Sequence, residues 1–173
     1  AKAVETALGK GQFPLVLGGD HSVAAGTVAG VAKHFRRSKE RIGLIWIDAH
    51  ADMNTPDTSP SGNVHGMPLA SCIGTGPDEL VKLAGFSPKV RPENVALVGI
   101  RDVDQLEKPH IKASGVRAFT MREIDERGLL HVMNEAIRIA SDGTAGFHLS
   151  FDMDGVDPDE APGVGTPVPA MTG

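Results

Sequence analysis

The sequence has few of the residues that mark several classes of protein. Cys72 is the only cysteine among 173 residues, which excludes a disulfide framework and a thiolate zinc site. Tyrosine is absent and aromatic residues make up 4% of the chain, so the core must be packed mainly by Val, Ile, Leu and Ala. Basic residues are outnumbered, and a net charge of −5 argues against nonspecific nucleic-acid binding.

Long hydrophobic stretches are also missing. No apolar run approaches the roughly 20 residues that span a bilayer, and no signal peptide is visible. With one cysteine, which fits a reducing compartment, these features predict a cytoplasmic protein without a membrane partner. The length fits a single domain over residues 1–173, long enough to bury a substantial core.

What the sequence does contain is an alternation of short apolar runs and helical segments. Such an alternation predicts an α/β fold with a parallel sheet and right-handed crossovers. The expected strands lie at 13–18, 42–47, 94–100, 116–119 and 146–152. The expected helices lie at 1–10, 22–37, 104–113 and 128–141, with shorter ones after Met67 and Asp78.

Acidic and imidazole side chains follow three of the expected strands. Asp48, His50 and Asp52 alternate directly after the second strand, so on extended backbone they project to the same side. The carboxyl ends of parallel strands form the ligand crevice of open α/β sheets. These features predict one constellation of six metal ligands: His21, Asp48, His50, Asp52, Asp152 and Asp154.

The composition of this set indicates which metal it would bind. Four carboxylates repel one another without counter-charge, and two divalent ions would neutralise them. Oxygen ligands with two imidazoles suit Mn²⁺ best, with Fe²⁺, Co²⁺, Ni²⁺ and Zn²⁺ as alternatives, whereas Ca²⁺ prefers oxygen alone. The competing interpretation is a group of solvated acidic loops whose spacing is accidental.

Three short motifs carry a resemblance to a known family. Gly18–Ser22 (GGDHS), Asp48–Asp52 (DAHAD) and Ser150–Asp154 (SFDMD) resemble, in order and separation, the metal motifs of the ureohydrolases, the arginase and agmatinase group. The resemblance extends over nearly the whole chain and implies a three-layer α-β-α fold. It also implies two Mn²⁺ ions bridged by Asp48 and Asp152, with His21 and Asp52 on one ion and His50 and Asp154 on the other.

The segment after the second motif resembles the substrate loop of arginases. The resemblance implies that Asp104 meets the α-ammonium group of the substrate and that Glu107 is a further contact to it. It also implies that Asp52 passes a proton to the departing amine and that His65 shuttles protons to solvent. The residues implied to contact the α-carboxylate are Asn54, Ser59, Ser61 and Asn63. The residue implied to line the guanidinium pocket is Thr166.

The implied reaction is hydrolysis of the guanidinium group of L-arginine to L-ornithine and urea. Two alternatives remain open: a sister hydrolase acting on agmatine or a guanidino acid, and a metal-binding module without catalysis. The chain begins inside an expected helix and ends where the family continues, so we expect a fragment truncated at both ends, with an incomplete sheet. The resemblance also implies a homo-oligomer for the full-length protein.

Two further residues have more than one interpretation. Arg101 could form a structural ion pair as easily as it could contact substrate. His148 shares strand parity with Asp152, so its imidazole could support a metal ligand, although plain packing is the preferred interpretation.

Overall fold

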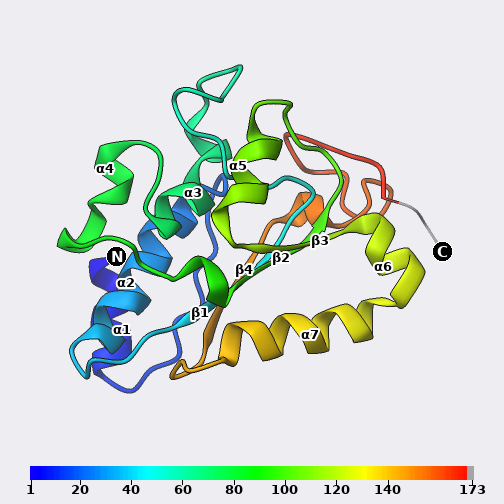
Figure 1. Ribbon diagram of the computed structural model, residues 1–173. Coiled ribbons are helices and arrows are strands. Elements are labelled where there is room, and N and C mark those ends of the chain that lie inside the picture. Colours follow the sequence, from blue (N-terminus) through cyan, green and yellow to red (C-terminus); the bar gives the residue numbers. More distant parts are fainter. Residues whose placement is uncertain (171–173) are drawn as a thin grey trace.

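Four parallel strands form the central layer of the protein. A computed structural model describes residues 1–170, and the strand order in the sheet is β3-β2-β1-β4 (Figure 1). Every neighbouring pair is parallel, as the sequence predicted. The strands are β1 Gly43–Ile47, β2 Val95–Ile100, β3 Arg117–Thr120 and β4 Phe147–Phe151.

Helices cover both faces of this sheet, which confirms the expected three-layer α-β-α arrangement. Side chains of α1, α2, α3 and α5 pack on one face, and side chains of α6 and α7 pack on the other. In Figure 1, α7 runs along one side of the sheet, opposite α1 and α2. The helices are α1 Lys2–Gly9, α2 Val23–Arg36, α3 Pro68–Ile73, α4 Asp78–Val81, α5 Glu107–Ser114, α6 Met121–Arg127 and α7 Leu129–Ser141.

The two central strands are buried on both faces, and this explains their unbroken apolar sequences. Leu44 and Trp46 of β1 point into the core beneath α2, whereas Ile45 points toward α7. All three side chains have no exposed surface. Within residues 1–170, none of the helices has the length and apolar character needed to cross a membrane.

The expected strand at 13–18 is wrong. The segment has no regular secondary structure, and Phe13, Leu15 and Leu17 are 91%, 78% and 86% exposed. A strand requires a neighbouring strand for its backbone hydrogen bonds, and no described strand pairs with this segment. β4 is therefore an edge strand of the described sheet, and its outer apolar side chains line an open cleft together with this segment.

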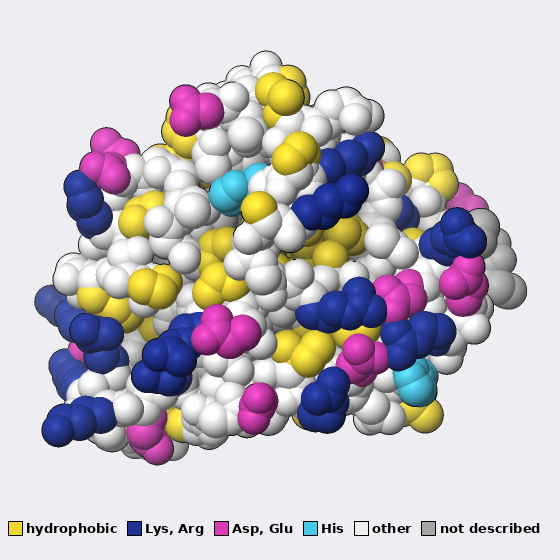
Figure 2. Space-filling model, in the orientation of Figure 1, with side chains coloured by type: hydrophobic (Ala, Val, Ile, Leu, Met, Phe, Trp, Pro, Cys, Tyr) yellow, Lys and Arg dark blue, Asp and Glu magenta, His cyan; other side chains and the backbone are white. Residues whose placement is uncertain are grey.

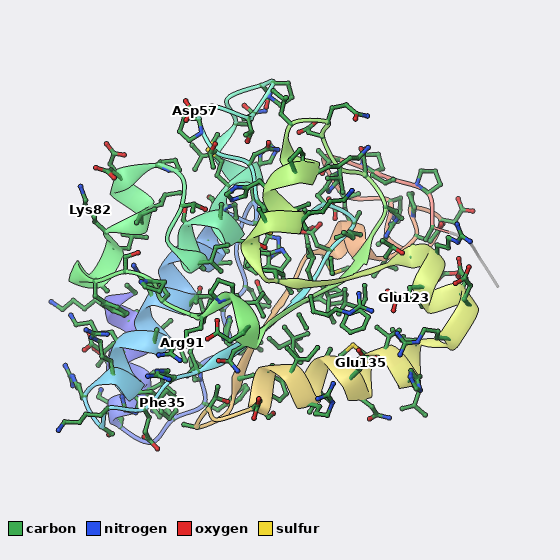
Figure 3. The ribbon with its side chains drawn as sticks, viewed as in Figure 1. Phe35, Asp57, Lys82, Arg91, Glu123 and Glu135 are labelled. Carbon is green, nitrogen blue, oxygen red and sulfur yellow. The ribbon has the colours of Figure 1, made fainter. Side chains whose placement is uncertain are left out.

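The structure also contains a helix that was not predicted from the sequence. α6 lies between the expected strand at 116–119 and the expected helix at 128–141. The Thr120 hydroxyl accepts a hydrogen bond from the Glu123 N–H at 3.2 Å, so the Thr-x-x-Glu capping pattern was present in the sequence. Arg127 then pairs with both Glu123 and Glu135, which links α6 to α7. Figure 3 labels the two glutamates.

Charged side chains of both signs lie on the surface. Figure 2 shows Lys and Arg side chains near Asp and Glu side chains along the left, lower and right parts of the face it presents. The loop after the second metal motif projects beyond the layers, and Asp57 lies near its outer end (Figure 3).

Gly43, the first residue of β1, gives a direct test of the contact between the sheet and α7. A Cβ atom at this position would lie 1.8 Å from the Ala140 carbonyl oxygen. Gly43→Ala should therefore lower the free energy of unfolding by about 1–3 kcal/mol, as overpacking does elsewhere. Gly9→Ala is the control, because nothing lies within 4 Å of its Cβ position. Urea denaturation that gives both variants wild-type midpoints would contradict this packing.

Candidate metal centre

The pairing of β1 with β4 brings the second and third motifs together. Ile47 is opposite Phe151 in the parallel register, and the Asp152 N–H donates to the Ile47 carbonyl at 2.9 Å. The next residue of each strand is an aspartate, so Asp48 and Asp152 leave the sheet side by side. The carboxyl edge of the sheet therefore carries the acidic residues, as the sequence predicted.

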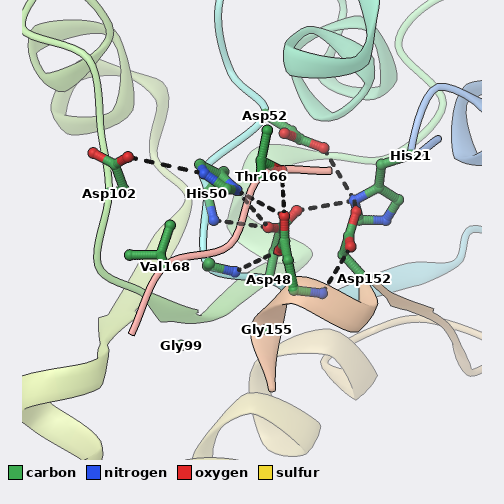
Figure 4. Close-up of polar contacts among 12 residues, drawn as sticks. His21, Asp48, His50, Asp52, Gly99, Asp102, Asp152, Gly155, Thr166 and Val168 are labelled. Carbon is green, nitrogen blue, oxygen red and sulfur yellow. Dashed lines mark hydrogen bonds and ion pairs between the residues drawn. The ribbon is translucent and has the colours of Figure 1, made fainter. Parts of the chain in front are cut away.

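His21 joins these aspartates from the turn that precedes α2. Its Nδ1 atom lies 2.9 Å from Asp48 Oδ2, 3.0 Å from Asp52 Oδ2 and 3.2 Å from Asp152 Oδ2 (Figure 4). Ligand atoms of His21, Asp48 and Asp152 all lie within 4.8 Å of one another. One imidazole nitrogen facing three carboxylates is the arrangement expected around a shared cation.

A second cluster forms next to the first and shares Asp48 with it. His50 Nδ1 lies 3.1 Å from Asp154 Oδ2 and 3.5 Å from Asp48 Oδ1. Because Asp48 uses Oδ2 toward His21 and Oδ1 toward His50, it is placed to bridge two ions. Asp152 belongs only to the first of the two clusters, and its Oδ1 accepts from the Asp154 N–H at 3.0 Å.

Without a bound cation, protons offset part of the negative charge of the site. Burial lowers the pKa of His21, but the adjacent carboxylates of Asp48 and Asp52 outweigh this effect and raise the pKa to about 10. Hydrogen bonding to Asp154 and Asp48 likewise raises the pKa of His50 to about 10. Burial raises the pKa of Asp48, but hydrogen bonds with both histidines reverse this effect and hold it below its usual range.

Asp52 shows how well the residues fit a cation. It is 5% exposed, and burial and the neighbouring Asp48 raise its pKa to about 8. Its buried Oδ2 atom lies 3.0 Å from His21 Nδ1 but outside hydrogen-bond geometry, and its φ of 52° is unusual for an aspartate. The backbone fixes this conformation, because the Asp52 carbonyl accepts from the N–H groups of Leu69 and Ala70 at the start of α3. A divalent ion would pair this otherwise unsatisfied oxygen.

Two supporting residues were missed in the sequence. Ser150 Oγ lies 2.8 Å from His21 Nε2, which leaves Nδ1 to face the carboxylates. Trp46 Nε1 donates to Asp48 Oδ2 at 3.0 Å, and the Trp46 and His21 rings stack with their centroids 4.0 Å apart. Ser150 shares strand parity with Asp152, and Trp46 shares it with Asp48. The parity that relates His148 to Asp152 therefore applies equally to these two residues.

His148 itself makes no described hydrogen bond to a ligand and lines the cleft instead. Burial lowers its pKa to about 4, so it is neutral at pH 7. Asp102 is nearer to the ligand set, because its Oδ2 lies 3.9 Å from His50 Nε2 (Figure 4).

The predicted substrate residues lie on the rim of a single cleft of about 1460 Å³ that opens over both clusters. Asn54 Nδ2 donates to Asp104 Oδ2 at 2.8 Å, which connects the loops carrying these two residues. The hydroxyls of Ser59 and Ser61 accept from backbone N–H groups within their own loop. The predicted residues that line the cleft are Asn54, Ser59, Ser61, Asn63, His65, Asp104 and Thr166.

Glu107 and Thr166 have partners within the protein. The Glu107 carboxylate is 3% exposed and accepts from the Met53 N–H at 2.8 Å and from the Asp104 N–H at 3.3 Å. It therefore joins the two substrate loops through their backbones. Thr166 Oγ1 donates to Asp154 Oδ2 at 2.8 Å, so its hydroxyl contacts the second cluster directly.

The comparison with protein families agrees with this geometry. The arginase family profile matches residues 1–170. The chain belongs to the arginase family. The arginase of Bacillus caldovelox is 54% identical over 168 residues, which are 97% of this chain and 55% of that protein. The chain thus spans about half the length of the arginase relatives it matches.

Solved structures of the family share this fold. The native B. caldovelox arginase superposes with a TM-score of 0.92 at 52% identity, covering 98% of this chain and 55% of that one. Entamoeba histolytica arginase in complex with L-ornithine gives 0.82 at 39% identity, covering 96% and 57%. A hypothetical agmatinase from Burkholderia thailandensis gives 0.71 at 27% identity, covering 98% and 46%.

Proposed function

We propose that this chain carries the metal-binding part of an arginase, a hydrolase that uses two Mn²⁺ ions to convert L-arginine and water into L-ornithine and urea. The observation that supports this most strongly is the pair of ligand clusters that share Asp48 at the carboxyl edge of the sheet. The six proposed ligands are His21, Asp48, His50, Asp52, Asp152 and Asp154, and their oxygen-rich set with two imidazoles suits Mn²⁺.

The protein's own residues would bind and orient the substrate and move the proton. Two bound ions supply the nucleophile, because metal coordination lowers the pKa of water to about 7. Asp52 would accept the proton that the attacking water loses and pass it to the nitrogen that leaves as the C–N bond breaks. His65 is exposed on the rim and would carry further protons between the site and solvent.

The rim residues would hold the amino-acid end of the substrate. Asp104 is exposed and acidic, which suits the α-ammonium group of L-arginine. Asn54 Nδ2 lies 2.8 Å from Asp104 Oδ2, so Asn54 would contact the neighbouring α-carboxylate together with the loop residues. Thr166 touches Asp154, which would place it beside the guanidinium group. The loop residues proposed to contact the carboxylate, with Asn54, are Ser59, Ser61 and Asn63.

Agmatine is the alternative substrate, because the agmatinase structure shares the fold. Agmatine lacks the α-carboxylate, so the polar rim loop would have no partner in it. The matched arginases are 36–55% identical to this chain, against 27% for the agmatinase, which favours arginine. A metal-binding unit without turnover is the remaining alternative for a chain that covers about half of its relatives' length.

The decisive experiment measures urea released from L-arginine and from agmatine by the Mn²⁺-loaded chain. Urea from arginine alone is the expected result. Urea from agmatine alone would move the assignment to the sister hydrolases. Two bound ions without urea would identify a metal-binding unit, and no bound metal would refute the proposed centre. The single domain, a cytoplasmic location and homo-oligomeric assembly of the full-length protein remain predictions from the sequence.

A further inference from the structure

Arg101 follows β2 and donates hydrogen bonds to the backbone that surrounds the second metal cluster. Its Nη2 atom lies 2.8 Å from the Asp154 carbonyl oxygen and 3.3 Å from that of Val156. Its Nη1 atom lies 3.0 Å from the Gly155 carbonyl oxygen. The successive carbonyl groups of residues 154–156, at the end of the third motif, therefore converge on one guanidinium group.

The same side chain also binds a more distant segment. Nε and Nη2 of Arg101 lie 3.2 and 2.8 Å from the Val168 carbonyl oxygen. Val168 is two residues from Thr166, whose hydroxyl donates to Asp154 Oδ2. Arg101 thus holds the turn that carries Asp154 and the segment that contacts the Asp154 carboxylate. Figure 4 places Gly155, Thr166 and Val168 beside the metal ligands.

Neither sequence interpretation of Arg101 describes these contacts. The hydrogen-bond acceptors described for it are all main-chain carbonyl oxygens, with no carboxylate among them. A guanidinium group has five N–H donors in a fixed planar array, so it can bind several carbonyl groups at once. A lysine ammonium has three donors and lacks this fixed geometry.

We propose that Arg101 is a positioning residue for the ion held by Asp48, His50 and Asp154. Its guanidinium fixes residues 154–156 and Val168 in the arrangement that brings Asp154 Oδ2 to 3.1 Å from His50 Nδ1. Asp154 is the only cluster ligand among the residues that Arg101 binds, whereas Asp152 of the first cluster is held by its own N–H bond to the Ile47 carbonyl, so the effect is larger for the second ion. This inference rests on the proposed two-metal function.

A purely electrostatic role predicts the opposite effect. A positive side chain beside a cation site weakens cation binding by repulsion. If repulsion were its main effect, Arg101→Met would strengthen binding of the second ion and Arg101→Lys would leave it unchanged. If position is what matters, both variants weaken binding, because neither can hold all of these carbonyl groups.

The test is calorimetric titration of the metal-free full chain with Mn²⁺, comparing wild type with Arg101→Lys and Arg101→Met. Wild type should bind two ions. In both variants the affinity for the second ion should fall by about 10–100-fold, as when other residues that orient metal ligands are replaced. The affinity for the first ion should fall much less, because the Asp152 N–H bond to the Ile47 carbonyl does not depend on Arg101. Arg91→Lys and Arg91→Met are the matched controls, since Arg91 is on the surface and pairs with Glu93.

Each outcome separates this inference from the proposed function. Wild type that binds no metal refutes the function itself. Wild type and both Arg101 variants binding two ions equally well refutes the positioning role, and so does equal weakening of both ions. If the Arg101 variants do not fold by circular dichroism, Thr166→Val tests the same segment. It removes only the hydroxyl that reaches Asp154, and an unchanged second affinity would overturn the proposal.

Discussion

Asp48→Asn is expected to abolish tight binding of both manganese ions. Asp48 is 1% exposed and belongs to both ligand clusters, with one oxygen directed to each. An asparagine keeps the shape but replaces one anionic oxygen with an NH₂ group, which cannot coordinate a cation. We expect each ion to bind at least about 100-fold more weakly, as measured by calorimetric titration.

Asp125→Asn is the control for this variant, because Asp125 is an exposed residue of α6, outside the cleft. It removes the same charge from the protein and should bind both ions like wild type. Circular dichroism should give both variants the wild-type helix content. Retention of two tightly bound ions by the Asp48 variant would show that Asp48 does not bridge.

Manganese binding is expected to strengthen steeply as pH rises from 6 to 7.5. His21 and His50 have pKa values of about 10, and Asp52 has one of about 8, so all three hold protons in this range. Metal ions bind the deprotonated ligands, so each binding step releases protons. The dissociation constant should fall about 100-fold per pH unit for the ion on His21 and Asp52, and about tenfold for the ion on His50.

Titrations in two buffers with different ionisation enthalpies measure the released protons directly. His131→Gln should leave the count unchanged, because this histidine is exposed on α7. Manganese affinities that do not change with pH would contradict the prediction that these ligands are protonated before the metal binds. The free energy of unfolding without metal depends on pH in the opposite direction. There, the raised pKa values of His21 and His50 add stability below about pH 6.5, which is lost as pH rises through about 10.

Local sequence was sufficient for most of the fold and for predicting that the proposed metal ligands meet at one edge of the sheet. The strands at 42–47 and 146–152 were visible as apolar runs, and β1 and β4 occupy them. Residues after parallel strands meet at one sheet edge, and side-chain parity is fixed by extended backbone. Asp48 and Asp152 could therefore be placed together before their register was known.

The expected strand at 13–18 is wrong because strand formation also depends on residues outside the segment. Its apolar composition favours a strand, but composition does not supply a hydrogen-bonding neighbour. Only the described sheet, with β4 at its edge, shows that this segment has none. His21 still lies beside Asp48, because the turn before α2 places it there without a strand.

The sequence by itself determined which side chains could bind metal, because ligand chemistry and strand periodicity are local properties. The tertiary structure alone decided how those ligands are held. Ser150 and Arg101 reach their partners across 129 and 67 residues of sequence, respectively. Asp52 adopts its unusual backbone conformation while its carbonyl binds the start of α3. Such contacts depend on how distant segments pack, and no local pattern encodes that.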